Sequence, residues 1–168
     1  MTLAHNHHAH TPSDNANPTL ATDIADVIAR RQGAQSLAGA IIAALPAHLC
    51  CIFQVTQHTL EYCGGAEEIS SGRVHKPAGK LIARMATLAT HAAGDTQIRQ
   101  HIASYRHAAW PALLTVPLIT ERKQPAGVLV AGRRDRAFTA SEIAAVQAVT
   151  PQVATYLSTH APVQPSQT

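Results

Sequence analysis

Apolar residues recur at helical spacing in two segments near the start of the chain. A first helix is predicted to begin at Pro18, because proline is favoured at the first helical position, and one apolar stripe follows at Leu20, Ile24, Val27 and Ile28. Gly33 is expected to end it. Ser36 is expected to cap a second helix, which Pro46 stops. The chain is therefore predicted to open with a bent pair of helices.

Two short runs rich in β-branched, aromatic and other apolar residues come next. Residues 49–56 and 59–63 flank Gln57 and His58, a spacing typical of two strands joined by a tight turn. Gly64 and Gly65 are expected to close this hairpin as a turn.

Helical spacing returns after Pro77. Apolar residues at Leu81, Ile82, Met85, Leu88 and Ala89 predict a helix that ends near Gly94. A short further helix, capped by Asp95, is predicted to carry Ile98, Ile102 and Tyr105 on one side.

The clearest hairpin lies in the second half of the chain. Residues 113–119 and 127–131 are nearly continuous apolar runs, and the polar residues 120–124 separate them. A strand without alternation is typical of a sheet buried on both faces. We therefore expect helices on one side of this sheet and other structure on its reverse side.

The last helix has the strongest start signal in the sequence. Thr139 and Glu142 match a capping box, and Phe138 is placed to pack against Ile143 as a hydrophobic staple. An apolar stripe follows, and Pro151 inside it is expected to bend the helix.

Both ends of the chain lack a repeating apolar face. Residues 1–17 are rich in His, Asn, Ser and Thr, and residues 160–168 are similarly polar. Segments of this composition bury too little apolar surface to offset the entropy of ordering. We predict disordered tails at 1–17 and 160–168 around one domain at 18–159, a size that suits a single core.

Composition narrows the function classes. Lys and Arg number 13 against 10 Asp and Glu, an excess too small to indicate nucleic-acid binding, and no aromatic residue is interleaved with the arginine pairs. Those arginines are expected to be solvated. An odd count of three cysteines, no secretory leader and no long apolar run predict a reduced protein of the cytoplasm that does not enter the membrane.

The second half of the chain resembles a GAF domain. The resemblance is carried by residues 114–118, a polar loop, Gly127 with residues 128–130, and Phe138-Thr139 with Glu142 before an apolar helix. It implies an α+β fold, GAF-like and related to PAS domains. The resemblance implies a six-stranded antiparallel sheet with both terminal helices on one face and a small-molecule pocket on the other.

GAF domains are often regulatory parts of kinases, phosphodiesterases and transcription factors, so the resemblance implies a sensor in signal transduction and no enzyme. We expect it to act through a separate signalling protein or as a homodimer. The better-known ligand signatures are missing. The Asn-Lys-Phe-Asp-Glu set of cyclic-nucleotide relatives has no counterpart, no cysteine precedes His as in bilin relatives, and residues 67–110 hold no cysteine for methionine sulfoxide reduction. The ligand and any cofactor are unidentified.

Candidate ligand contacts follow from the predicted pocket. His101 and Tyr105 would share one face of the short middle helix, although an exposed histidine at a helix edge is the commoner situation. The full set of predicted ligand contacts is Cys51, Phe53, Cys63, His101, Tyr105, His107, Trp110 and Thr115.

Two further chemistries are weaker alternatives. Cys50 and Cys51 are expected on opposite faces of one strand, where cysteine usually acts as a small hydrophobe. A redox or sulfoxide-reductase-like enzyme that works through Cys51 and Cys63 is the lesser option. The cluster His5, His7, His8 and His10 offers imidazoles to a metal ion but no scaffold, so we assign no metal site.

A pure dimerisation or docking module without a ligand is the alternative function. It is suggested by the apolar stripes of the first and last helices, because the resemblance implies that such stripes meet across a two-fold axis, as they often do in GAF-like proteins. The predicted interface residues are Ile24, Val27, Ile28, Val146, Val149, Val153 and Leu157.

Overall fold

A six-stranded antiparallel sheet forms the centre of the protein. The structure is a computed structural model that describes residues 18–70, 72–102 and 110–159. The sheet order is β3-β2-β1-β6-β5-β4, and every neighbouring pair is antiparallel. The strands are β1 (Leu49–Thr56), β2 (Thr59–Ser70), β3 (Arg73–His75), β4 (Arg99–Ile102), β5 (Ala112–Ile119) and β6 (Pro125–Arg133).

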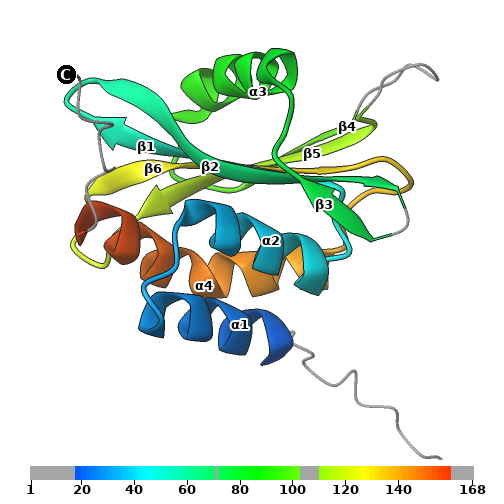
Figure 1. The fold of residues 1–168 in the computed structure, drawn as a ribbon. Coiled ribbons are helices and arrows are strands. Elements are labelled where there is room, and N and C mark those ends of the chain that lie inside the picture. The colour runs from blue at the N-terminus through cyan, green and yellow to red at the C-terminus, as the bar shows by residue number, and fades with distance from the viewer. Residues whose placement is uncertain (1–17, 71, 103–109, 160–168) are drawn as a thin grey trace, which may run out of the picture.

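Helices cover both faces of the sheet. On one face lie α1 (Pro18–Ala29), α2 (Ala34–Ala44) and α4 (Ala140–Thr159), and α3 (Gly79–Ala92) lies on the other (Figure 1). Each face has its own apolar cluster, because alternate residues of the central strands point to opposite sides. This confirms the predicted α+β fold, with both terminal helices on one face of the sheet.

The opening helices are confirmed, but the start of α2 differs from the prediction. Helix α1 begins at Pro18. Gly33 is the N-cap of α2 and makes no side-chain cap bond, and the amides of Ser36 and Leu37 already donate to the Gly33 carbonyl. The expected cap at Ser36 is therefore wrong, because the first turn closes three residues earlier.

The glycine pair that was expected to be a turn lies inside β2. Gly65 pairs with Cys51, and the strand continues to Ser70. A Cβ on Gly64 would lie 2.5 Å from the Gln35 nitrogen at the start of α2, so the glycine lets the helix approach the strand. The glycines serve close packing, and the strand β3 that follows was not predicted.

The capping box at the start of α4 is confirmed. The Glu142 amide donates to Thr139 Oγ1 at 3.2 Å, and the Thr139 amide donates to Glu142 Oε1 at 2.9 Å. Pro151 lies within the helix as predicted.

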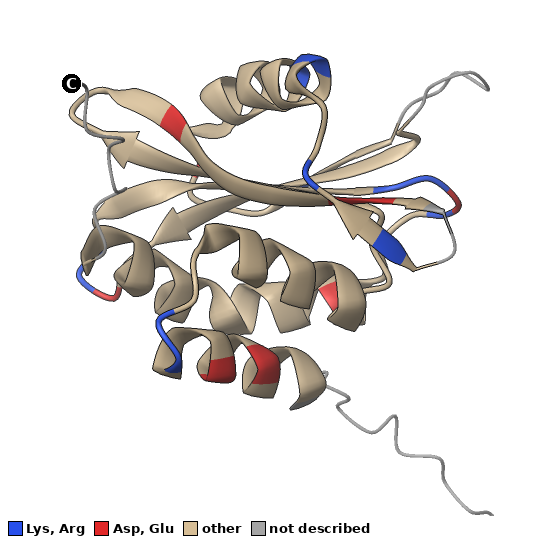
Figure 2. Ribbon diagram, in the orientation of Figure 1, with Lys and Arg blue, Asp and Glu red and all other residues tan. Residues whose placement is uncertain are grey.

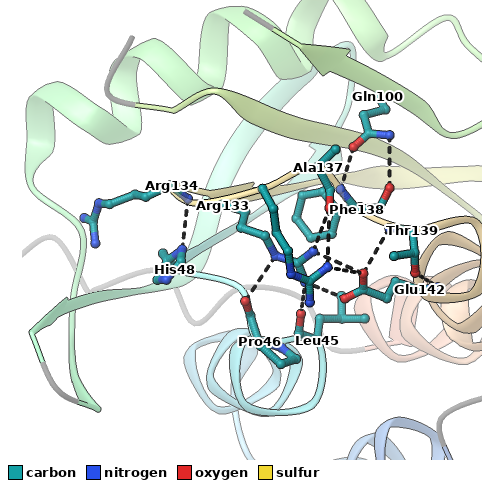
Figure 3. A network of polar contacts seen from close by, with 11 residues as sticks. Leu45, Pro46, His48, Gln100, Arg133, Arg134, Ala137, Phe138, Thr139 and Glu142 are labelled. Atoms are coloured by element: carbon teal, nitrogen blue, oxygen red, sulfur yellow. Dashed lines mark hydrogen bonds and ion pairs between the residues drawn. The ribbon is translucent and has the colours of Figure 1, made fainter. Parts of the chain in front are cut away.

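Arg133 is buried, which corrects the expectation that the arginines are solvated. Its side chain is 0% exposed, and its guanidinium lies 4.2 Å from the centre of the Phe138 ring. It donates to the carbonyls of Leu45, Pro46 and Ala137 and to both carboxylate oxygens of Glu142 (Figure 3). One guanidinium therefore joins the end of α2, the end of β6 and the start of α4.

The residues of the predicted dimer interface pack inside the chain. Ile24, Val27, Val146, Val149, Val153 and Leu157 are buried in the cluster between the sheet and its three helices, and Ile28 packs against that cluster. The apolar stripes of α1 and α4 are thus accounted for by intrachain packing. These seven side chains are not an open surface, and the homodimer itself stays a prediction.

Candidate functional site

The α3 face of the sheet carries an apolar cluster separate from the larger core. Strands β1 and β6 supply its floor, and α3 covers it with Met85, Ala89 and Ala92. The floor residues are Leu49, Cys51, Phe53, Val128 and Val130. Phe53 and Tyr62 meet edge to face, with ring centres 5.9 Å apart. This face matches the side of the sheet on which the small-molecule pocket was expected.

Several predicted ligand contacts come together on this face. Cys51, Phe53 and Trp110 belong to the cluster. Thr115 is 1% exposed and pairs across the sheet with Val130, so its side chain points to the same face. His101 Nε2 lies 3.1 Å from Thr115 Oγ1. The hydroxyl of Thr115 and the ring of His101 therefore form a polar pair beside an apolar floor.

His101 reaches Thr115 from a strand, so the predicted short helix after Asp95 is wrong. Residues 99–102 form β4, which pairs with residues 112–115 of β5. Asp95 makes an ion pair with Arg99 at 2.9 Å instead of capping a helix. The open edge of β5 supplies hydrogen-bond partners that a short isolated helix lacks, which outweighs the local helical spacing.

Cys63 lies on the opposite side from Cys51. A bulge in β2 leaves Cys63 unpaired, because Ile52 pairs with Gly64 and Phe53 with Tyr62. The thiol of Cys63 packs against the larger core and lies 3.2 Å from the Ile52 carbonyl oxygen. Cys63 and Cys51 therefore do not share a face, and Cys63 as a ligand contact stays a prediction, whereas the opposite facing of Cys50 and Cys51 is confirmed.

The thiols are protonated at neutral pH. Burial, with a smaller contribution from the charge of Glu67, raises the pKa of Cys51 to about 12. Burial also raises the pKa of Cys63 to about 12, against a small lowering by a backbone hydrogen bond, and raises that of Cys50 well above its usual value. A thiolate nucleophile is therefore disfavoured at all three positions, which weakens the redox alternative.

Trp110 is held in place by residues that sequence analysis did not predict to contact it. The guanidinium of Arg134 lies 4.5 Å from the centre of the Trp110 ring and pairs with Glu67 at 3.0 Å. A Cβ on Gly132 would lie 3.0 Å from the same ring. Arg134 and Glu67 are 67 residues apart, so no local pattern could have predicted their pairing.

Gln100 is a second residue that sequence reasoning missed. Its side chain accepts from the Phe138 amide at 2.7 Å and donates to the Phe138 carbonyl at 3.3 Å (Figure 3). Because neighbouring strand residues point to opposite faces, Gln100 contacts the start of α4 while His101 contacts Thr115 on the α3 face. Strand β4 therefore links the candidate site to the helical layer.

The remaining predicted site residues are not placed. Tyr105, His107 and the cluster His5, His7, His8 and His10 lie outside the described residues. Within the described ranges, no group of three or more His, Cys, Asp or Glu side chains could hold a metal ion. No helix among those ranges is both long and apolar enough to cross a bilayer.

A groove also lies beside α4, on the face of the sheet opposite α3 and outside the predicted site. It has a volume of about 920 Å³ and lies between residues 96–98, the β5–β6 hairpin and α4. Its floor includes Pro117 and Ile119, and Glu121 and Lys123 of the hairpin also line it.

Comparison with known proteins establishes the family. A GAF domain family model matches residues 31–158. The chain is a GAF domain. A search of curated proteins found no match. The GAF domain of a putative sensor histidine kinase from Pseudomonas syringae pv. tomato is 15% identical over 88% of this chain and 91% of that one, with a TM-score of 0.62.

Two further solved GAF domains have the same fold. That of an Acinetobacter phosphoenolpyruvate-protein phosphotransferase is 14% identical over 86% of this chain and 93% of its own, with a TM-score of 0.57. The phycocyanobilin-bound GAF domain of a cyanobacterial phytochrome is 13% identical over 86% and 94%, with a TM-score of 0.58. GAF domains are generally sensory or regulatory modules of signalling proteins rather than catalysts.

Proposed function

We propose that this GAF domain is a ligand-responsive regulatory module whose small-molecule site lies between the sheet and α3. The observation that carries the proposal is the separate apolar cluster on the α3 face, with the buried hydroxyl of Thr115 beside it. Small-molecule sites in proteins are mostly apolar and hold a few polar groups that orient the ligand.

Four residues would contribute to ligand binding. Phe53 would supply an aromatic contact from the floor, and Trp110 would supply one at the end of the cluster. His101 and Thr115 would supply the polar contact, since each already satisfies the other at 3.1 Å and a ligand could replace either partner. The ligand expected from this set has a flat apolar body and at least one hydrogen-bonding group.

Ligand binding would be transmitted to the rest of the domain by a movement of β4. A ligand that displaces His101 would also move Gln100, which holds Phe138, two residues before α4, through both atoms of its side-chain amide. Output would then pass to a separate signalling protein or to a second copy of the chain. Sedimentation at high protein concentration tests self-association. If the protein stays monomeric at every concentration, the output would pass to a separate signalling protein.

Native mass spectrometry of the protein purified from its own host tests the ligand. We expect a bound small molecule that disappears from the denatured spectrum. The His101→Ala and Thr115→Val variants should retain less of it, while His58→Ala, an exposed histidine in the β1–β2 turn, should retain as much as the parent protein. A parent protein that carries no molecule, or equal retention by all three variants, would refute the proposal.

A further inference from the structure

One continuous part of the chain carries only positive charges. Residues 69–94 contain Arg73, Lys76, Lys80 and Arg84 and no Asp or Glu. The other nine Lys and Arg and all ten Asp and Glu lie elsewhere, so the rest of the chain has a formal charge of −1 against +3 overall. Figure 2 shows these cations on β3, on the connection after it and at the start of α3. We call these four residues the basic stripe.

None of the four cations of the basic stripe has an acidic partner among the described residues. All four side chains are exposed. Of the carboxylates on β2, Glu67 pairs with Arg134, whereas Glu68 accepts the Gly72 amide at 3.3 Å and forms no ion pair with the basic stripe. By contrast, Arg99 at the opposite sheet edge pairs with Asp95. The charge of the basic stripe is therefore available to a partner.

Two cations of the basic stripe, Arg73 in β3 and Lys76 directly after it, lie at an open strand edge. Strand β3 is the last strand of the sheet and pairs only with β2, so the backbone groups on its outer side have no strand partner within the described chain. All three of its residues are exposed, with Val74 at 47%, and Ile69 on β2 is 59% exposed. An edge of this kind is a template for an added strand.

We propose that an extended acidic segment of a partner protein adds to the outer edge of β3 and is selected by the basic stripe. Backbone hydrogen bonds to β3 would hold the segment, and apolar residues of the segment would contact Val74 and Ile69. Its carboxylates would meet Arg73 and Lys76 on the edge, and Lys80 and Arg84, which share one face of α3.

Two other occupants fit less well. A second copy of this chain would bring the same four cations to the same edge, which opposes pairing by like-charge repulsion. A nucleic acid would gain only a few phosphate contacts, and the basic stripe holds no aromatic residue for base stacking, while Val74 and Ile69 would stay unused. The proposal does not depend on a ligand at the α3 face.

Fluorescence anisotropy with the full chain tests the proposal. The probe is a labelled peptide of alternating Glu and Val, which has strand propensity and acidic charge on one face. We expect a Kd below about 1 mM at low ionic strength that weakens as salt is raised. A peptide of alternating Lys and Val should not bind. Hydrogen exchange of the β3 amides should slow in the complex, while that of the β4 edge should not change.

Matched charge reversals identify the surface. The double variant Arg73→Glu, Lys80→Glu should bind the acidic peptide about tenfold more weakly. Arg30→Glu with Arg122→Glu changes the total charge equally at exposed positions away from the basic stripe and should have less than about a twofold effect. Thermal unfolding confirms that both variants fold, since all four side chains are exposed.

Four outcomes would overturn the proposal. These are no binding of the acidic peptide, equal loss in both double variants, protection of β4 amides instead of β3 amides, or tighter binding of single-stranded oligothymidylate than of the peptide. The last result would assign the basic stripe to the phosphate backbone of a nucleic acid.

Discussion

Replacing Arg133 with methionine tests whether its buried guanidinium holds α2, β6 and α4 together. Methionine keeps much of the side-chain length and its contact with the Phe138 ring but donates no hydrogen bond. The carbonyls of Leu45, Pro46 and Ala137 then lose a charged donor, and Glu142 loses its buried partner.

The expected loss of stability is large for a single substitution. Removing one partner of a buried ion pair costs about 3–5 kcal/mol, out of the 5–15 kcal/mol typical of a whole domain. Glu142 keeps part of its support, because Arg136 and the Thr139 amide still donate to it. We therefore expect about 3 kcal/mol, the lower end of that range.

Urea unfolding followed by circular dichroism measures this loss. At a typical slope of about 1–3 kcal/mol per molar urea, the midpoint should fall by roughly 1–3 M. Arg136→Met is the matched control, because Arg136 pairs with the same carboxylate but is 50% exposed, and it should cost less than about 1 kcal/mol. Equal midpoints for Arg133→Met and the parent protein would refute the reasoning.

Lowering the pH should weaken the contact between Arg133 and Glu142 in the parent protein. Burial raises the pKa of Glu142, but hydrogen bonds from Arg133, the Thr139 amide and Arg136 outweigh this and lower it from 4.5 to about 2. A carboxylate with a lowered pKa stabilises the fold above its unfolded pKa, so this contribution is present above about pH 4.5 and lost as pH falls toward 2. Because Glu142 is partly solvated, screening keeps this contribution below the roughly 3 kcal/mol that the full shift would represent. Glu142→Gln should flatten this part of the stability profile, and an unchanged profile would contradict the assignment.

Three further predictions concern packing, the β4 link and the thiols. Gly127→Ala should destabilise the protein by more than about 2 kcal/mol in thermal or urea unfolding, because its Cβ would lie 2.1 Å from a β1 carbonyl oxygen, whereas Gly39→Ala in open space within α2 should stabilise it by about 0.5–1 kcal/mol. Similar values for both would show that the close approach at β1 is absent. Gln100→Ala should speed hydrogen exchange of the β4 amides and cost about 1–2 kcal/mol, and unchanged exchange would remove the link. Cys51 and Cys63 should resist alkylation at pH 7 until the protein unfolds, because burial raises both pKa values to about 12, and rapid labelling of the folded protein would contradict their burial.

Local patterns predicted much of the architecture. The apolar stripes, the Pro18 start and the capping box of Thr139 and Glu142 all correspond to observed helices, because these signals act within one or two turns of the chain. The nearly continuous apolar runs of β5 and β6 correctly indicated a sheet buried on both faces.

The errors occurred where a distant segment decides the local conformation. The spacing of Ile98 and Ile102 resembles a helix, yet residues 99–102 pair with β5 because that edge offers hydrogen bonds. Gly64 resembles a turn residue, yet it lies in a strand so that α2 can approach. Cys63 was grouped with Cys51 because no sequence signal marks the bulge that turns it to the other face.

The sequence by itself determined the order of most elements, the faces that they bury and the family resemblance, because hydrophobic periodicity and capping depend on neighbouring residues. Only the tertiary structure decided which polar side chains meet. Arg133 is buried because it satisfies carbonyls at the end of α2, 87 and 88 residues away in sequence, and His101 reaches Thr115 because β4 pairs with β5. Contacts between such distant residues depend on chain topology, which no local pattern encodes.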